Sequence, residues 1–456
     1  MNPVKIPIRA FPKPKRYQPR RTWIQIAPLF LILAVAGTLS TALAQKVSVV
    51  LIVADGFEWN DASLHQKAKV ETPHIDSIGR EGVRADRYIL TEPGSGSLIA
   101  LLTGRYPIST VLPDPDGESD HAQVGFDFKD PVMGHVFKKN DYRTGWLGRW
   151  PFASNGGTSP KDLGFDTSSR TAEEEGSAEP SKADGAENPR RTSHDLVKEK
   201  NSQLVTEFGR FLENARSEES GDPFLAVIAP LSYRAVDSVP KPVGEELRKR
   251  LGADAPEWEL RRAASAAETD RTVGGILDVI GSATLKDEPL ILFTSAGSVA
   301  AGGRQPWLDE GQEGIDEGGS RVPLFIKGKW IASGKMIVPP IADIDILPSL
   351  KTFCSLLLDE SDSKYEGLSM AALAYGLPMK WRNRSIFQFD RESGDIGAIR
   401  TLEWRAVRSP EENSDWRLYH MFIDPEQNKD VASEHKEEVS AFTSELKEAY
   451  LKRAGR

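Results

Sequence analysis

The chain has 456 residues, of which 39% are hydrophobic and 27% are charged, and its formal net charge is −9. This composition is typical of a globular protein and excludes a disordered chain and a polytopic membrane protein. The first 44 residues contain seven Lys and Arg and no acidic residue, which leaves a charge of −16 on the rest. An acidic body repels phosphate groups at long range, so we expect no nucleic-acid partner.

The amino terminus has the pattern of an export signal. Its basic segment is followed by an apolar run over residues 24–43, and Ala42-Leu43-Ala44 has the small-x-small pattern of a signal peptidase site. The run is also near the roughly 20 residues that span a bilayer, so an uncleaved membrane anchor is the alternative. We therefore predict that residues 1–44 are a signal peptide or anchor of an exported protein that is periplasmic, secreted or membrane-anchored.

The first segment after this signal is predicted to be a buried strand. Residues 47–54 are almost continuously apolar and rich in β-branched side chains, a pattern typical of a strand covered on both faces. Asp55 follows it directly, and the carboxyl ends of such strands are where ligands bind in a doubly wound sheet. Thr72-Pro73 then marks the start of an amphipathic helix.

Strand-like and helical segments then alternate along the chain. This order predicts an α/β sandwich over residues 45–377. The helices are expected at residues 98–102 and 263–280, and the strands at 224–229, 290–294 and 322–326.

Two further regions have a different composition. Residues 167–200 contain few large apolar side chains, so we predict a flexible surface insertion loop. Residues 378–456 are predicted to form a smaller subdomain with an antiparallel sheet and a closing helix. Its strands are expected at 386–389, 404–407 and 417–421, and its helix at 434–452.

Nine segments between residue 47 and about residue 430 resemble, in content and order, the sulfatase family of the alkaline phosphatase superfamily. The segments are V-V-L-I-V-A-D, E-T-P-H-I-D-S-I-G-R-E-G-V-R, A-L-L-T-G-R-Y-P, D-Y-R-T-G-W-L-G-R-W, L-G-F-D, I-L-F-T-S, E-G-G-S-R-V-P-L-F-I, D-I-D-I-L-P-S-L and L-Y-H-M-F-I-D-P-E. The resemblance implies the sulfatase α/β fold with its smaller carboxyl-terminal sheet. It also implies a divalent metal, usually calcium, and a formylglycine nucleophile made from the first residue of C-x-P-S-R.

The nucleophile position of this family falls on a glycine. Counting back from A-L-L-T-G-R places the nucleophile at Gly94, the proline at Gly96 and the arginine at Leu98, and only Ser97 matches. Glycine has no side chain to oxidise, so formylglycine cannot form at this position. The resemblance therefore implies the fold of a sulfatase without its nucleophile.

The metal ligands implied by the family are also changed. Asp55 matches the first of two paired aspartates, whereas Gly56 replaces the second, and the later S-D-N-G reads S-A-G-S at residues 295–298. Calcium takes six to eight oxygen ligands, so we expect no bound cofactor. Asp55 is then either a residual metal ligand or a carboxylate in the turn after the strand.

Positive charge is retained at two positions of the family's site. The lysine of G-K-W-H falls on Arg149, and the histidine of P-H-x-P aligns with Arg234. Together with Ser97 at a helix amino end, these arginines are candidates for an anion site, because guanidinium groups and backbone N–H groups suit sulfate and carboxylate. The alternative is that the arginines are solvated or paired with acidic neighbours.

These observations predict an exported, catalytically inactive pseudo-sulfatase that binds an anionic ligand such as a sulfated or acidic glycan. One alternative is a residual sulfuric ester hydrolase or a phosphoester hydrolase with Thr91 or Ser95 as nucleophile. Another is a scaffold that binds partners through its acidic surface and the 167–200 loop. Cys354 lies in an apolar stretch and is predicted to be a buried core residue.

Overall fold

The computed structural model describes residues 46–65, 68–107, 132–152, 158–169, 193–216, 222–232, 239–296, 317–357, 364–378, 381, 384–390, 395–408 and 416–453. The predicted signal peptide or anchor and the candidate anion ligand Arg234 lie outside these residues. Residues 46–456 form one compact unit. Within its described part, no helix has the length and apolarity to span a bilayer.

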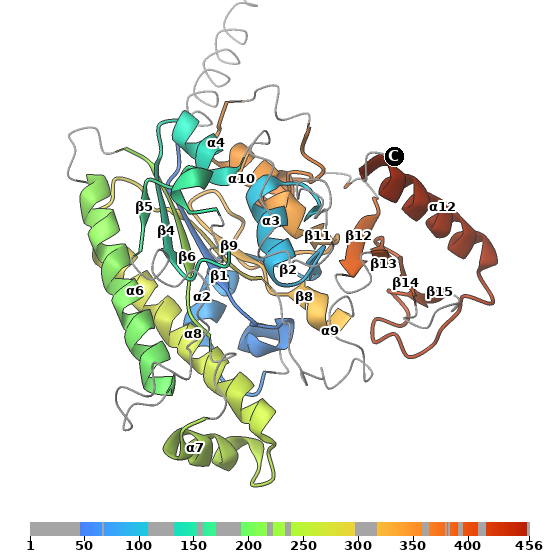
Figure 1. The fold of residues 1–456 in the computed structure, drawn as a ribbon, viewed down its shortest axis with the longest axis horizontal. Coiled ribbons are helices and arrows are strands. Elements are labelled where there is room, and N and C mark those ends of the chain that lie inside the picture. The colour runs from blue at the N-terminus through green and yellow to red at the C-terminus, as the bar shows by residue number, and fades with distance from the viewer. Residues whose placement is uncertain are drawn as a thin grey trace, which may run out of the picture. The chain divides into compact units, whose positions relative to one another are not determined.

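The centre of the unit is a buried mixed sheet, in which β9 runs antiparallel to its neighbours β7 and β2. The eight strands run in the order β10-β2-β9-β7-β1-β6-β4-β5 (Figure 1). Its central strands are β1 (Val49–Ala54), β6 (Phe224–Ala229), β4 (Arg143–Gly148) and β7 (Leu290–Ser295), and their pairs are parallel. Every residue of β1, β6 and β7 is buried, which confirms strands covered on both faces.

Helices cover the two faces of this sheet. Successive side chains of β1 point alternately to one face and the other, so they pack in two different cores. Val50 and Ile52 pack in a core with α2 (Pro73–Glu81), α6 (Ser193–Arg216) and α8 (Glu257–Ser282). The intervening Val49, Leu51 and Val53 pack in a second core. Its helices are α3 (Ser95–Thr103), α4 (Met133–Lys139) and α10 (Ile346–Phe353). The predicted α/β fold class is therefore confirmed, and Cys354 is buried in the second core as predicted.

The strands outside the central four are short. The main sheet is completed by β5 (Thr167–Ser168), β9 (Phe325–Lys327), β2 (Val83–Ala85) and β10 (Lys335–Ile337). A small sheet contains β11 (Ile341–Ala342), β3 (Tyr88–Ile89) and β8 (Arg321–Val322). Further helices among the described residues are η1 (Trp59–Asp61), η2 (Ser63–His65), η5 (Lys161–Leu163), α7 (Lys241–Leu251), α9 (Glu317–Ser320), η7 (Asp343–Asp345) and α11 (Ala371–Ala374).

One predicted strand is wrong in its extent. Residues 322–326 were expected to form a single strand, but they divide between β8 and β9, which belong to different sheets. Pro323 lies at the break and has no backbone N–H to donate to a ladder. The chain therefore leaves the small sheet there and enters the main sheet two residues later.

The predicted insertion loop is shorter than residues 167–200. Its first residues form β5, which pairs with β4, and α6 begins at Ser193. Val197 of α6 is buried in the core beside the main sheet, so this part of the segment does contribute an apolar contact. Residues 170–192, the interior of the predicted loop, lie outside the described residues.

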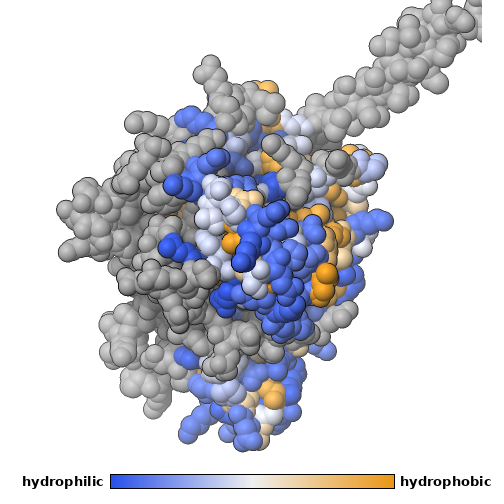
Figure 2. Space-filling model, turned by 90° about the vertical axis from the view of Figure 1, so that its right-hand side faces the viewer, coloured by the Kyte–Doolittle hydropathy of each residue, from blue (hydrophilic) through white to orange (hydrophobic). Residues whose placement is uncertain are grey.

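The carboxyl-terminal part contains the predicted antiparallel sheet and closing helix. Its strands are β12 (Ile386–Asp390), β13 (Asp395–Arg400), β14 (Trp404–Arg408) and β15 (Trp416–His420), followed by α12 (Lys436–Arg453). The sequence did not predict β13. Among the residues coloured in Figure 2, hydrophilic ones predominate and apolar ones form smaller groups, as is normal for a protein surface.

Candidate functional site

The candidate site lies where the carboxyl ends of the four central strands meet. Asp55 follows β1, Arg149 follows β4, Ala296 follows β7, and Ser232 comes three residues after β6 ends. The ladders extend past the strand ends, because the N–H of Ala296 donates to the Ala54 carbonyl at 2.9 Å. The carboxyl edge of a parallel sheet is the usual position of a ligand site in this type of fold.

Asp55 and Arg149 form an ion pair at this edge. The Arg149 Nη1 donates to Asp55 Oδ2 at 2.6 Å, although the two residues are 94 positions apart. The Ser232 hydroxyl donates to the same carboxylate oxygen at 3.3 Å. Of the two predicted environments for Arg149, the structure therefore shows pairing with an acidic neighbour, and it brings two of the candidate residues together.

The position of Arg149 depends on the glycine before it. Gly148 has φ +100°, and a Cβ atom on it would lie 2.1 Å from the Ala229 carbonyl oxygen of β6. The N–H of Arg149 then donates to that same oxygen at 2.9 Å. Only glycine permits this close approach of β4 to β6, so Gly148 fixes the point from which the Arg149 side chain extends.

The described residues do not fit a calcium ion. No group of three or more His, Cys, Asp or Glu side chains in the described ranges is arranged to hold a metal. Asp55, predicted to match the first metal aspartate of the family, is bonded to a guanidinium. Calcium requires several oxygen ligands, and a positive group beside Asp55 disfavours a second cation there.

The nucleophile position, Gly94, is the residue before α3. It has φ 88° and ψ −135°, a backbone conformation that residues with a side chain rarely adopt. Its N–H donates to the Ala296 carbonyl at 2.9 Å. The hydroxyl of Ser97, which is buried, contacts the carbonyls of Gly94 at 2.9 Å and Ala296 at 2.7 Å. Ser97, predicted as an anion ligand, thus joins the loop to the end of β7.

The other end of this loop is held through the backbone of Thr91. The Thr91 N–H donates to Asp343 Oδ2 at 3.0 Å, and the Thr91 carbonyl accepts the Phe389 N–H at 2.8 Å. Asp343 is fully buried, and burial raises the pKa of its carboxyl to about 8. The small carboxyl-terminal sheet, to which Phe389 belongs, therefore contacts the site loop directly.

Sequence reasoning missed two residues of the site region. Ser232 was not predicted as a site residue. It directly precedes residues 233–238, which include Arg234 and lie outside the described residues. Asp343 occurs in D-I-D-I-L-P-S-L, but that segment served only to establish the resemblance. An acidic residue before an apolar helical segment is the signal that would have predicted a carboxylate at a helix start.

Solved structures of other proteins share this fold. The crystal structure of Ps i-CgsB in complex with k-i-k-neocarrahexaose has a TM-score of 0.69 and 20% identity, covering 89% of this chain and 92% of that one. Phosphonate monoester hydrolase of Agrobacterium radiobacter has a TM-score of 0.63 and 17% identity, covering 90% and 96%. The fold is that of the sulfatases and phosphonate hydrolases, an alkaline-phosphatase-like α/β fold.

A sequence comparison gives the family. The sulfatase family model matches residues 48–352, which is more than half of the chain. The chain belongs to the sulfatase family.

Two curated relatives illustrate the similarity. The ulvan-active sulfatase of Formosa agariphila is 26% identical over 332 residues, which are 67% of this chain and 61% of that protein. The N-acetylgalactosamine-6-sulfatase of Canis lupus familiaris is 22% identical over 440 residues, 90% of this chain and 81% of that protein. The match to the first relative thus spans about three fifths of its length.

Proposed function

We propose that this protein is a non-hydrolytic member of the sulfatase family that binds a sulfated or carboxylated glycan at the carboxyl edge of the main sheet. The observation that carries the proposal is the Asp55–Arg149 ion pair. Sulfatase chemistry needs an activated nucleophile and a cation that offsets charge on the transferring group. Gly94 supplies no nucleophile, and a guanidinium bonded to Asp55 provides the positive charge.

Arg149 is suited to an anionic ligand. A guanidinium carries five N–H donors in a planar fork, and the bond to Asp55 is made through Nη1. The Arg149 side chain is 45% exposed, so solvent and solutes reach the group. The fork geometry matches two oxygens of a sulfate or a carboxylate, which favours these groups over neutral sugars.

The names of the relatives support a sulfated saccharide as the ligand class. One relative is described as ulvan-active, and one solved structure holds k-i-k-neocarrahexaose. Another solved structure holds its substrate D-glucosamine-2-N,6-O-disulfate. We therefore propose that the glycan carries sulfate, and that a carboxylated glycan is the second choice.

The test compares binding and turnover on the same protein. We expect a sulfated oligosaccharide, but not its desulfated form, to bind in calorimetry, with no sulfate released from it or from 4-nitrophenyl sulfate. Calcium is expected to leave the melting temperature unchanged. Arg149→Ala should weaken binding at least tenfold, or about 1.4 kcal/mol. Arg143→Ala is the matched control, because Arg143 begins the same strand at its opposite end.

Three results would contradict the proposal. Sulfate release that disappears in Asp55→Ala would show a working sulfatase. Turnover of a phosphodiester or phosphonate ester with added zinc or manganese would favour the hydrolase alternative. A phosphonate monoester hydrolase has a similar fold, which is why these substrates are included in the test. Equal binding of sulfated and desulfated oligosaccharide would remove the anion site.

A further inference from the structure

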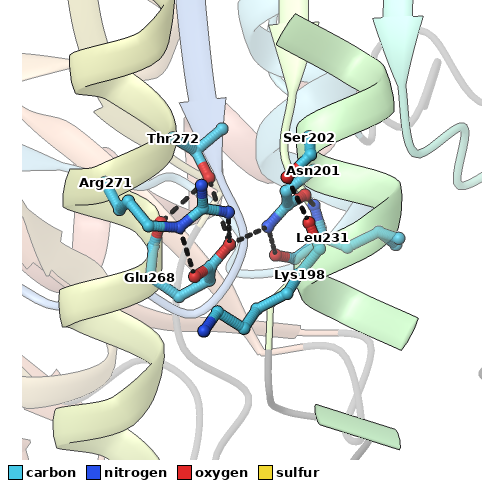
Figure 3. Close-up of polar contacts among 7 residues, drawn as sticks. All are labelled: Lys198, Asn201, Ser202, Leu231, Glu268, Arg271 and Thr272. Atoms are coloured by element: carbon cyan, nitrogen blue, oxygen red, sulfur yellow. Dashed lines mark hydrogen bonds and ion pairs between the residues drawn. The ribbon is translucent and has the colours of Figure 1, made fainter. Parts of the chain in front are cut away.

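We propose that Asn201 is a positioning residue for the candidate site, holding the chain after β6 so that Ser232 meets Asp55. This inference rests on the proposed anion site and names residues outside it that set its geometry. Asn201 lies on α6 and is 1% exposed, so it is not itself a ligand-binding residue. It acts through the backbone of Leu231 (Figure 3).

The Asn201 side chain makes both backbone hydrogen bonds of Leu231. The Leu231 N–H donates to Asn201 Oδ1 at 2.9 Å, and Asn201 Nδ2 donates to the Leu231 carbonyl at 3.0 Å. A neighbouring strand would make the same pair of bonds. The amide therefore holds the chain in place two residues beyond Ala229, where β6 ends.

A carboxylate on α8 fixes the orientation of this amide. Asn201 Nδ2 also faces Glu268 Oε1 at 3.5 Å, and Glu268 is only 6% exposed. Arg271 donates to both oxygens of that carboxylate, with Nε at 2.8 Å and Nη2 at 2.5 Å (Figure 3). Because an ionised carboxylate only accepts hydrogen bonds, a flipped Asn201 amide would place oxygen against oxygen and lose both bonds to Leu231.

The held segment leads directly to the ion pair. Ser232 follows Leu231, is 8% exposed, and donates to the Asp55 oxygen that also accepts Arg149. A hydroxyl that shares this oxygen weakens the hold of the carboxylate on the guanidinium. When Ser232 is displaced, Asp55 binds Arg149 more strongly, and an incoming anion competes less well for the arginine.

The first experiment tests the clamp without any ligand. In hydrogen-exchange measurements on the full chain, the Leu231 amide should exchange slowly, and Asn201→Ala should remove this protection. Ser202→Ala is the matched control on the same helix, because the Ser202 hydroxyl bonds to the exposed carbonyl of Lys198 at 2.8 Å. Equal exchange at Leu231 in the wild type and Asn201→Ala would overturn the clamp, whether or not the protein binds an anion.

The second experiment tests the coupling to the site. Asn201→Ala and Ser232→Ala should each weaken binding of the sulfated oligosaccharide about fivefold, the lower end of ordinary coupling between sites. The double variant should bind no more weakly than Ser232→Ala alone, because both changes break one chain of contacts. A lower melting temperature with unchanged affinity in Asn201→Ala would show a structural role only and overturn the proposal.

A rescue variant separates orientation from packing. Asn201→Asp keeps the size of the side chain but places a second carboxylate beside Glu268, so affinity should fall. Adding Glu268→Gln restores a donor opposite the new carboxylate but not the bond to the Leu231 carbonyl, so it should recover part of the loss. Failure of this rescue would overturn the role of Glu268. If the wild type binds no sulfated oligosaccharide, the proposed function fails and the exchange result alone decides whether Asn201 holds Leu231.

Discussion

The two ends of the loop between β3 and α3 differ in what holds them. Thr91 is bonded on its N–H by buried Asp343 and on its carbonyl by Phe389 of the carboxyl-terminal sheet. Gly94, three residues later, has no side chain and a backbone conformation that suits glycine. Contacts with a buried carboxyl and a neighbouring strand therefore hold the loop at Thr91, whereas its other end carries a glycine at the position where we predicted the nucleophile of a sulfatase.

The ion pairs near the two ends of the loop also differ, because one is buried and the other is partly exposed. Breaking the buried pair is expected to have the largest effect on the free energy of unfolding. Asp345, beside Asp343, is fully buried and accepts the N–H groups of Ala342 at 2.8 Å and Leu368 at 2.7 Å as well as Arg384. Arg384→Ala leaves this carboxylate without its cation and should lower the free energy of unfolding by about 3–5 kcal/mol. Urea denaturation monitored by fluorescence measures the loss.

The control for this change is Arg149→Ala, which breaks the exposed ion pair of the candidate site. The Arg149 and Asp55 side chains are 45% and 19% exposed, so the loss there should stay within about 1 kcal/mol. Equal losses in the two variants would remove the distinction between a buried support and an exposed site.

A pH dependence comes from the base of the loop. Burial raises the pKa of Asp343 to about 8, so the folded state keeps a proton that the unfolded state loses near its ordinary pKa of about 3.9. The contribution of this group to stability is complete below that lower value and is lost as pH rises toward the upper one. Asp343→Asn should remove a slope of about 1.4 kcal/mol per pH unit between about pH 5 and 7.

Unfolding free energies of the wild type and Asp343→Asn across that pH range measure the difference in slope. Parallel curves would show that Asp343 ionises in the folded protein and that the base of the loop is not held by a protonated carboxyl.

A smaller effect than that of Arg384→Ala is expected at the α3 end of the loop. Gly94→Cys introduces a side chain at φ 88° and should lower the free energy of unfolding by about 1–3 kcal/mol. We expect no sulfatase activity in this variant, because the Asp55–Arg149 ion pair remains in place. A stable Gly94→Cys variant that releases sulfate would show that only the nucleophile had been missing.

The fold was largely predictable because its central strands are long apolar runs. The bounds predicted for β6 agree with the structure, since residues 224–229 are buried on both faces and carry no polar residue. Strands with a weaker apolar pattern were harder to predict. The strand β13 begins with Asp395 and contains a glycine, so its apolar pattern is weak, and its pairing with β12 and β14 supplies what the sequence does not show.

The candidate site was predictable only in part. Asp55 was placed at a strand end from its local sequence, and the structure has it there. Its pairing with Arg149 joins positions 94 apart, and no local pattern reports such a contact. Ser97 was expected to bind an anion. Its hydroxyl instead contacts the backbone carbonyls of Gly94 and Ala296, because the start of α3 lies against the residue that follows β7.

The Asp55–Arg149 pair also bears on how the site matures. A metal centre is filled from solution, so its charge depends on the supply of the ion and is lost to a chelator. A guanidinium belongs to the chain, is present once in every molecule, and stays charged at any pH at which the protein is folded. The positive charge at this edge of the sheet is thus in place as soon as the strands that carry Asp55 and Arg149 have paired through β6.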